Sequence, residues 1–321
     1  MIFLLSLLMI ADLPYPLVTY LDDQTETPDG LFLTRPMDAV IFEGKLYIAD
    51  MSNMKVFVLD GKELTAFGQA GTGPGEFQHS PQYLEVRQEG LAVGEFNHLR
   101  TSYFTAAGTF LRMEKRGENT GRMAALGFRR LRREDSRKTG YILRDVANDC
   151  LMSKPEDVSD KGFHLSKLYF RQGDDGLLFL IKRSGKLEVY QRPCKRITSM
   201  PLPFELFKAK IKPNSVSTQF ARLKNPGSKV VAYFHGVPII GAAVRDKHTV
   251  WLLVKDENKE EPPYYQSVTG ANNWLYEVDP IEKKVTFSME CPYPVSRIRY
   301  MDGHLILLSQ YESSVAVYDV R

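Results

Sequence analysis

Residues 46–77 read LYIADMSNMKVFVLDGKELTAFGQAGTGPGEF, a series of short apolar runs separated by turn residues. Ser52-Asn53 and Asp60-Gly61 are such turns, and they divide runs that are rich in β-branched and aromatic residues, the pattern of antiparallel hairpins. Together with the residues just before it, the stretch predicts four short strands with the sequences MDAVIF, KLYIAD, MKVFVLD and KELTAFG. We therefore expect a small four-stranded antiparallel sheet.

The same layout recurs along the chain. An acidic residue followed by glycine stands directly before an apolar run at Glu43-Gly44, Glu89-Gly90, Asp175-Gly176 and Asp302-Gly303. The spacing of the apolar runs is roughly 40 to 50 residues, a period typical of four-stranded propeller blades. Six such units predict an all-β fold, a six-bladed β-propeller that occupies residues 12–321 as a single domain.

The sixth unit is one strand short, because the chain stops after SVAVYDV. An unpaired sheet edge has to be covered, and LVTYL at residues 17–21 is apolar, β-prone and otherwise unassigned. We expect this N-terminal strand to complete the last blade and to close the ring.

The stretch 46–77 resembles the NHL-repeat pattern and the related six-bladed bacterial propellers. The matching elements are YIAD, Asn53 three residues after Asp50, the Asp60-Gly61 turn and the connector GTGPGEF. Asp50 and Asn53 are interpreted as turn formers rather than ligands, and the connector as structural, with Phe77 buried between two sheets.

The resemblance implies that loops joining the blades line the mouth of a central channel, where a ligand would bind. The residues expected nearest to it open the innermost strands or lie in the connectors: Arg35, Asp38, Gln82, Glu85, His79, His235, Arg297 and Arg299. Asp38 and Glu85 are open to two interpretations, either paired carboxylates for acid and base chemistry or ordinary ion-pair partners of Arg35.

Composition excludes little beyond disorder and multiple membrane spans. The 321 residues carry a net charge of +3, with 43% hydrophobic and 25% charged residues, as in ordinary globular proteins.

The basic segment RRLRREDSRK at 129–138 is interpreted as a solvated edge, with RNA contact as the alternative. The aromatic loop at 262–265, PPYY, suits either a peptide or sugar ligand or a stacked structural loop.

The first ten residues, MIFLLSLLMI, resemble the hydrophobic part of a secretory signal ending near residue 11. Periplasmic or secreted location in a bacterium is expected, and the alternatives are a misplaced start codon and a buried first strand.

The three cysteines, Cys150, Cys194 and Cys291, match neither a disulfide framework nor a metal motif. Three unpaired thiols are the favoured interpretation, with a single bridge as the alternative.

These features favour a monomeric binding module for a protein, peptide or carbohydrate, without an integral membrane domain and without nucleic acid as a partner. No catalytic residue and no cofactor is assigned. The second hypothesis is a metal-dependent hydrolase or lyase that uses channel residues, with calcium or zinc at the channel end, because such enzymes occur among the propellers that the chain resembles. RNA binding through the basic segment is the third.

Overall fold

In a computed structural model, the protein is described at residues 13–95, 100–115, 128–132, 141–152, 168–182, 186–202, 239–255, 273–291 and 293–321. All regular elements in these ranges are β-strands. The chain divides into two compact units, Met1–Arg122 with Tyr265–Leu275 and Met289–Arg321, and Met123–Tyr264 with Tyr276–Ser288. The single-domain assignment of residues 12–321 stays a prediction. The described ranges contain no helix that is both long and apolar enough to span a bilayer.

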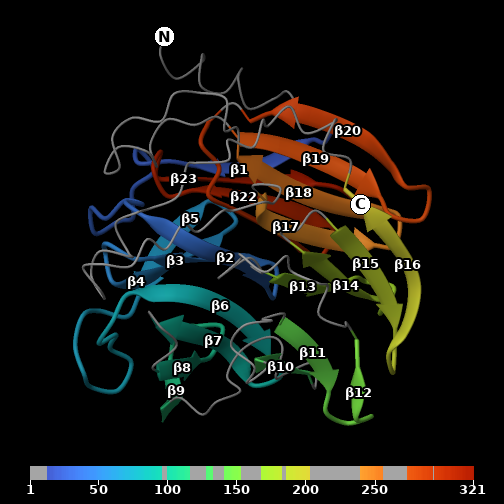
Figure 1. Cartoon of the computed structure of the whole chain (residues 1–321). Helices are drawn as coiled ribbons and strands as arrows, with labels where there is room; N and C mark the ends of the chain where they lie inside the picture. The colour runs from blue at the N-terminus through green and yellow to red at the C-terminus, as the bar shows by residue number, and fades with distance from the viewer. Residues whose placement is uncertain are drawn as a thin grey trace, which may run out of the picture. The chain divides into compact units, whose positions relative to one another are not determined.

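The first unit contains three antiparallel blades of four strands each (Figure 1). The first blade consists of β2 (Pro36–Phe42), β3 (Lys45–Asp50), β4 (Lys55–Asp60) and β5 (Glu63–Phe67). The second blade consists of β6 (Pro81–Arg87), β7 (Gly90–Glu95), β8 (Arg100–Phe104) and β9 (Phe110–Lys115). Within each blade the strands follow one another in chain order, as the repeated hairpin turns predict.

The third sheet of this unit, the closing blade, joins the two ends of the chain. Its strands β21 (Arg297–Met301), β22 (His304–Ser309) and β23 (Ser314–Asp319) are completed by β1 (Leu17–Leu21). Tyr20 pairs with Ala316 and Leu21 with Val315, so β1 is antiparallel to β23, and Figure 1 shows them side by side. The prediction that residues 17–21 complete the last blade is confirmed.

The first blade is buried on both faces, which explains its nearly continuous apolar strands. Ala39, Ile48 and Phe57 pack with Ile306 and Val317 of the closing blade. Their neighbours in sequence point to the other face because side chains alternate along a strand. That second set packs against the second blade and consists of Val40, Tyr47, Ala49, Val56 and Val58 together with Phe77, Leu84, Leu91, Val93 and Phe104.

The glycine-rich connector between the first two blades has the structural role that its sequence predicts. Gly71 has a φ of 157°, and a Cβ there would lie 2.0 Å from the carboxylate of Glu76. That carboxylate accepts a hydrogen bond from the Gly73 N–H at 2.8 Å, which lowers the pKa of Glu76. Phe77, directly after it, is fully buried between the two blades. No phosphate-binding role is needed to explain these glycines.

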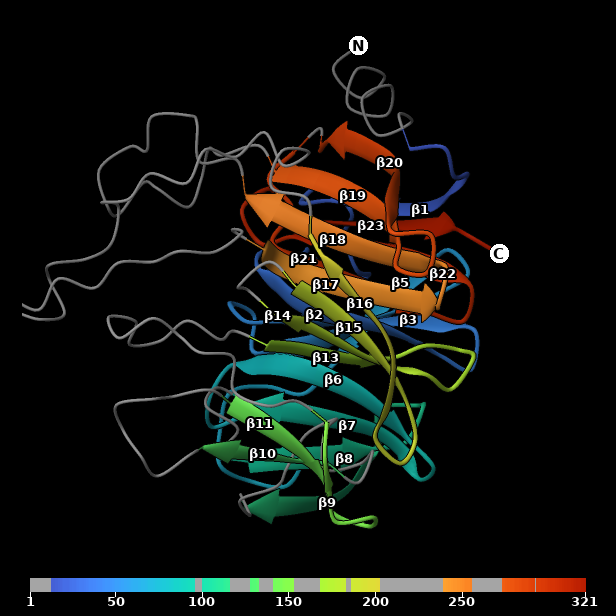
Figure 2. The ribbon, with the colours of Figure 1, turned by 45° about the vertical axis from the view of Figure 1, so that its right-hand side comes forward.

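The remaining strands form three sheets. A short sheet contains β10 (Phe128–Arg132), β11 (Tyr141–Asp145) and β12 (Cys150–Leu151), and the third blade contains β13 (Leu168–Gln172), β14 (Leu178–Lys182), β15 (Lys186–Gln191) and β16 (Lys195–Pro201). The fourth blade contains β17 (Ile239–Asp246), β18 (Thr249–Lys255), β19 (Asn273–Asp279) and β20 (Lys284–Glu290). Figure 2 shows these last four strands as successive arrows of one sheet.

The prediction of six four-stranded blades is wrong. The described residues form five four-stranded blades, while the third sequence unit yields only the three-stranded short sheet, whose last strand has two residues. This unit has the densest charge in the chain, in RRLRREDSRK, and only GYILRDV as a clear apolar run. A sequence of that kind offers too few apolar side chains for four paired strands.

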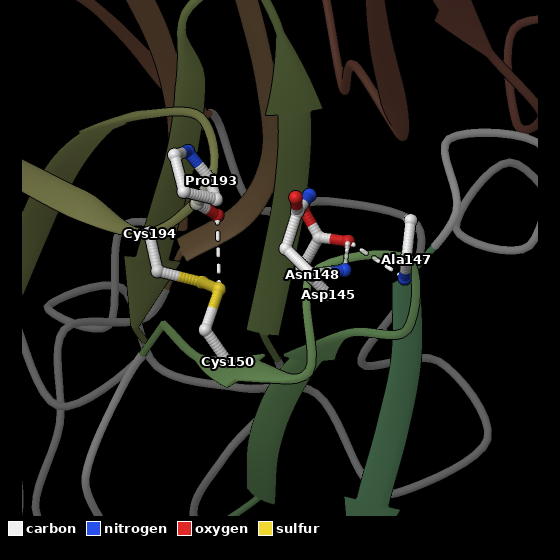
Figure 3. The surroundings of a disulfide bond; sticks show 6 residues. All are labelled: Asp145, Ala147, Asn148, Cys150, Pro193 and Cys194. Carbon is white, nitrogen blue, oxygen red and sulfur yellow. Dashed lines mark hydrogen bonds between the residues drawn. A yellow bond between two sulfur atoms is a disulfide. The ribbon is translucent and has the colours of Figure 1, made fainter.

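A disulfide bond joins Cys150 of the short sheet to Cys194, which lies in the turn between β15 and β16 (Figure 3). The interpretation of all three cysteines as unpaired thiols is therefore wrong, and the single-bridge alternative holds. The Cα atoms are 6.2 Å apart, and the Cys150 sulfur lies 3.3 Å from the Pro193 carbonyl oxygen. Cys291 stays free and buried, and burial raises the pKa of its thiol to about 12.

Loss of this disulfide should destabilise the second unit. The bridge spans 44 residues, and the chain-entropy model gives up to ~4 kcal/mol for a loop of that length. We expect Cys150→Ser, Cys194→Ser and the double variant to lower the free energy of unfolding by similar amounts, measured by urea denaturation. Dithiothreitol should reproduce the effect in the wild type and add nothing in the variants. If the free-energy losses of the two single variants added up in the double variant, the two cysteines would not act through one disulfide bond.

Candidate functional site

The candidate site lies where the first strands of three blades of the first unit come together. β2 packs against both β6 and β21. In β2 and in β6 the ladder skips one residue, Met37 between Pro36 and Asp38, and Gln82 between Pro81 and Tyr83. Such β-bulges leave the extra residue unpaired and redirect the side chains that follow. The two bulges occupy equivalent positions, 45 residues apart.

Arg297, the first residue of β21, binds both bulges. One guanidinium nitrogen, Nη1, donates to the carbonyl oxygen of Met37 at 2.7 Å and to that of Gln82 at 3.0 Å. These are the main-chain groups of the two residues that the ladders skip. A buried carbonyl without a donor is costly, so Arg297 compensates for the irregularity in two neighbouring blades at once.

The carboxylate of Asp38 is the centre of the cluster. Its side chain is almost completely buried and lies 3.0 Å from Arg299 Nε and 3.3 Å from Arg297 Nη1. It also accepts hydrogen bonds from the Leu84 N–H at 2.9 Å and from its own neighbour, the Ala39 N–H, at 3.1 Å. One carboxylate thus links β2, β6 and β21.

The arginine side chains keep part of their surface accessible. The exposed fraction is 30% for Arg297 and 19% for Arg299, against 1% for Asp38. The Arg297 guanidinium also lies 5.2 Å from the centre of the Tyr83 ring, within the range of a cation–π interaction. Two guanidinium groups and one carboxylate sum to one positive charge beside an aromatic ring.

The structure brings together four of the predicted residues, namely Asp38, Gln82, Arg297 and Arg299, and places three others apart from the cluster. The Arg35 main-chain N–H donates to the Asp50 carboxylate at 2.7 Å, and among the described residues the ion-pair partners of Asp38 are Arg297 and Arg299. Glu85 forms an ion pair with Arg87 at 2.8 Å. The His79 main-chain N–H donates to Glu95 at 2.7 Å. Asp38 and Glu85 therefore have separate partners.

His235 falls outside the described residues, as do residues 1–11 of the expected signal segment and the PPYY loop at 262–265. Of the basic segment 129–138, residues 129–132 lie in β10 and the rest is outside the described ranges. Within those ranges no group of three or more His, Cys, Asp or Glu side chains gathers in a way that could hold a metal ion.

Asp50 and Asn53 are turn formers, as predicted. Asp50 is completely buried at the end of β3 and accepts from the Asn53 N–H at 2.9 Å and from the Thr34 N–H at 2.8 Å. The Asn53 side-chain amide donates to the Phe32 carbonyl at 3.0 Å. Glu95 ends β7 in the equivalent way, buried and bound to the N–H of His79. In the first two blades the acidic residue at the end of the second strand therefore ties that strand to the segment that enters the blade.

Sequence reasoning missed Tyr83 and Met37, and it named Gln82 without foreseeing that the Gln82 carbonyl, like that of Met37, binds Arg297. A usable signal was present in the alignment of Pro36 with Pro81. Proline has no N–H for the ladder and is confined to strand starts, edges and bulges. An identical proline at the start of two innermost strands therefore indicates a matching irregularity.

Comparisons with known proteins identify the fold. No family model matches the sequence, and no curated protein matches it. A protein from Bacteroides fragilis that is thought to be exported is similar in structure, with a TM-score of 0.54, 12% identity, and coverage of 96% of this chain and 95% of its own. A DUF4221 member from Bacteroides vulgatus has a TM-score of 0.53 and 9% identity, with 96% of this chain and 97% of its own covered. Both are β-propellers, and this chain has a β-propeller fold with four-stranded blades.

The cluster should contribute strongly to stability. Arg297→Lys loses the planar guanidinium that serves two carbonyls and a carboxylate, so it should cost about 1–3 kcal/mol of unfolding free energy. Arg299→Lys should cost less, because Arg299 does not bind the bulges of both blades. Chemical denaturation of both variants checks this order.

In a double-mutant cycle, Asp38→Asn and Arg297→Lys should be strongly non-additive because their groups share one network. If Arg297→Lys and Arg299→Lys lowered the free energy of unfolding equally, the assigned role of Arg297 would be contradicted. Additive free-energy losses in the double-mutant cycle would contradict it as well.

Proposed function

We propose that this protein is an extracytoplasmic β-propeller that acts as a binding module. Its ligand is a protein, peptide or carbohydrate that carries an acidic group, and it binds at the first strands of the blades beside Arg297, Arg299 and Tyr83. The observation that carries this proposal is the cluster of two partly accessible guanidinium groups and an aromatic ring around one buried carboxylate.

The composition of the cluster supports binding rather than catalysis. Asp38 accepts hydrogen bonds from two main-chain N–H groups and lies within ion-pair distance of two arginines, so the fold itself supplies its partners. The Asp38 side chain is only 1% exposed, so its carboxylate is engaged with the fold rather than presented to a substrate. Arginine and tyrosine, by contrast, are the side chains that most often dominate recognition surfaces.

Two observations support an extracytoplasmic location. The bond between Cys150 and Cys194 is of a kind that persists in oxidising compartments and is rare in the reducing cytoplasm of mesophiles. In addition, one of the similar structures belongs to a protein thought to be exported. The apolar sequence at residues 1–10 agrees with both.

Ligand binding can be tested with a capped triglutamate peptide and its triglutamine counterpart, titrated into the purified protein and followed by calorimetry. We expect the triglutamate peptide to bind in a salt-dependent manner and the triglutamine peptide to bind at least about tenfold more weakly, the effect of one charge-assisted hydrogen bond. Arg299→Gln should reduce the affinity for triglutamate by a similar factor.

Arg196→Gln is the matched control, because its side chain is 56% exposed and lies on β16 of the second unit. This variant should bind triglutamate as the wild type does. Equal affinity for the two peptides, or an Arg299→Gln variant with unchanged affinity, would contradict the proposed site while leaving the fold intact.

Export can be tested separately. Full-length protein expressed in a bacterium should appear in the osmotic-shock fraction, with Cys150 and Cys194 protected from alkylation until a reductant is added. A variant that lacks residues 2–11 should stay in the cytoplasm, and its two cysteines should be alkylated without reductant. Retention of the full-length protein in the cytoplasm would overturn the proposed location.

A further inference from the structure

A cleft of about 380 Å³ lies between the first and second blades, away from the Asp38 cluster. The first blade contributes most of its lining, from three successive strands, and the second blade contributes the turn between β8 and β9. The lining residues are Lys45, Val58, Asp60, Glu63, Thr65, Ala66, Phe67, Ala106 and Ala107. The volume is that of ordinary small-ligand sites.

Small residues in the second blade keep the cleft open. The β8–β9 turn carries two alanines, and the Tyr47 hydroxyl fixes the turn by donating to the Ala106 carbonyl at 2.6 Å. Gly108 follows, with a φ of 77°, and a Cβ there would lie 2.6 Å from the Phe67 ring. The turn therefore approaches the first blade closely at Gly108 and leaves space beside Ala107.

The first blade supplies a row of charges at one end of the cleft. Lys45 lies 2.7 Å from Asp60, and this contact raises the pKa of Lys45. Asp60 is in turn directly opposite Glu63 in the antiparallel ladder. Like charges in directly opposite positions destabilise a sheet. Glu63 makes no hydrogen bond or ion pair within the described part of the chain.

The charges at this end of the blade sum to a negative value. Among the residues that line the cleft, Asp60 and Glu63 carry negative charge and Lys45 carries positive charge, which leaves one carboxylate in excess. A divalent metal ion would need more ligands, and no group of three or more suitable side chains occurs within the described ranges. The cation that best fits two carboxylates is therefore an organic one.

An apolar wall continues from the charged row. Glu63, Thr65 and Phe67 alternate along β5 on the same face, and Val58 is paired with Thr65 on the neighbouring strand. Val58 is buried and Phe67 half-buried. The cleft thus offers carboxylates at one end and hydrocarbon surface over the next two rows of the sheet.

We propose that this cleft binds a lysine side chain of a partner polypeptide. The ammonium group lies between the carboxylates of Asp60 and Glu63, and the aliphatic stem lies along Val58 and Phe67. A lysine side chain suits this arrangement because its ammonium has three rotatable donors, and the two acceptors stand on different strands rather than in the planar fork that arginine requires. Its four-carbon stem commonly packs on apolar surface.

The test uses N-acetyl-lysine N-methylamide, compared with the norleucine compound of the same length and with the Nε-acetylated lysine compound. Chemical-shift titration of the wild-type protein should give a saturable response to the lysine compound and affinities at least about tenfold weaker for the two neutral compounds. Glu63→Gln should weaken the binding of the lysine compound by a similar factor. Ala107→Leu should also weaken it, because a larger side chain fills the cleft.

Asp29→Asn is the matched control, because Asp29 is an exposed carboxylate of the same unit outside the cleft, and this variant should bind as the wild type does. Urea denaturation confirms that each variant is folded. Wild-type protein that does not bind the lysine compound, equal binding of the norleucine compound, or unchanged affinity in Glu63→Gln would overturn the proposal. The Arg299→Gln variant should keep this affinity, which separates the cleft from the site of the proposed function.

Discussion

The arrangement of the first unit depends on how the irregularities of its innermost strands are satisfied. Met37 and Gln82 are left out of their ladders, and each would otherwise hold a carbonyl without a donor in a closely packed region. Arg297 binds both carbonyls, and Asp38 holds Arg297 and Arg299 while it accepts an N–H from the second blade. The polar interactions at the first strands thereby tie together three blades that the apolar faces alone would leave free to slide, since hydrophobic packing is not directional.

This network also decides what the cluster can do. The same arginines that stabilise the blades keep a fraction of their surface accessible, and Tyr83 lies beside one of them. A recognition surface built on such residues is rigid, because every charged group is already fixed by the fold. The cost of this arrangement is that a substitution at Arg297 affects both stability and binding, so Arg299 is the more informative position for separating the two.

Much of the fold was predictable from the sequence, because turn residues and alternating apolar positions act locally. The strand KLYIAD was placed to the residue, and β1 was found because a sheet edge needed a partner and 17–21 was the free apolar segment. The predicted number of blades was wrong because local patterns are weakest in the charged third unit.

The candidate site was half predictable. Asp38 and Arg297 were placed near one another by their positions in the repeat, but the prolines that mark the two bulges do not tell which side chain binds the bulge carbonyls. The bond between Cys150 and Cys194 was missed for a similar reason, since spacing alone does not tell which thiols meet.

The pairing of β1 with β23 has a consequence for how the protein is made. These strands lie almost 300 residues apart in the chain, so β1 is synthesised long before β23 and has to wait for it before their hydrogen bonds can form. Until then β23 and its blade are incomplete, and the sheet edge stays open to unwanted partners. The closing blade therefore stays incomplete until β23 has been synthesised, and β1 has to remain available for pairing throughout that interval.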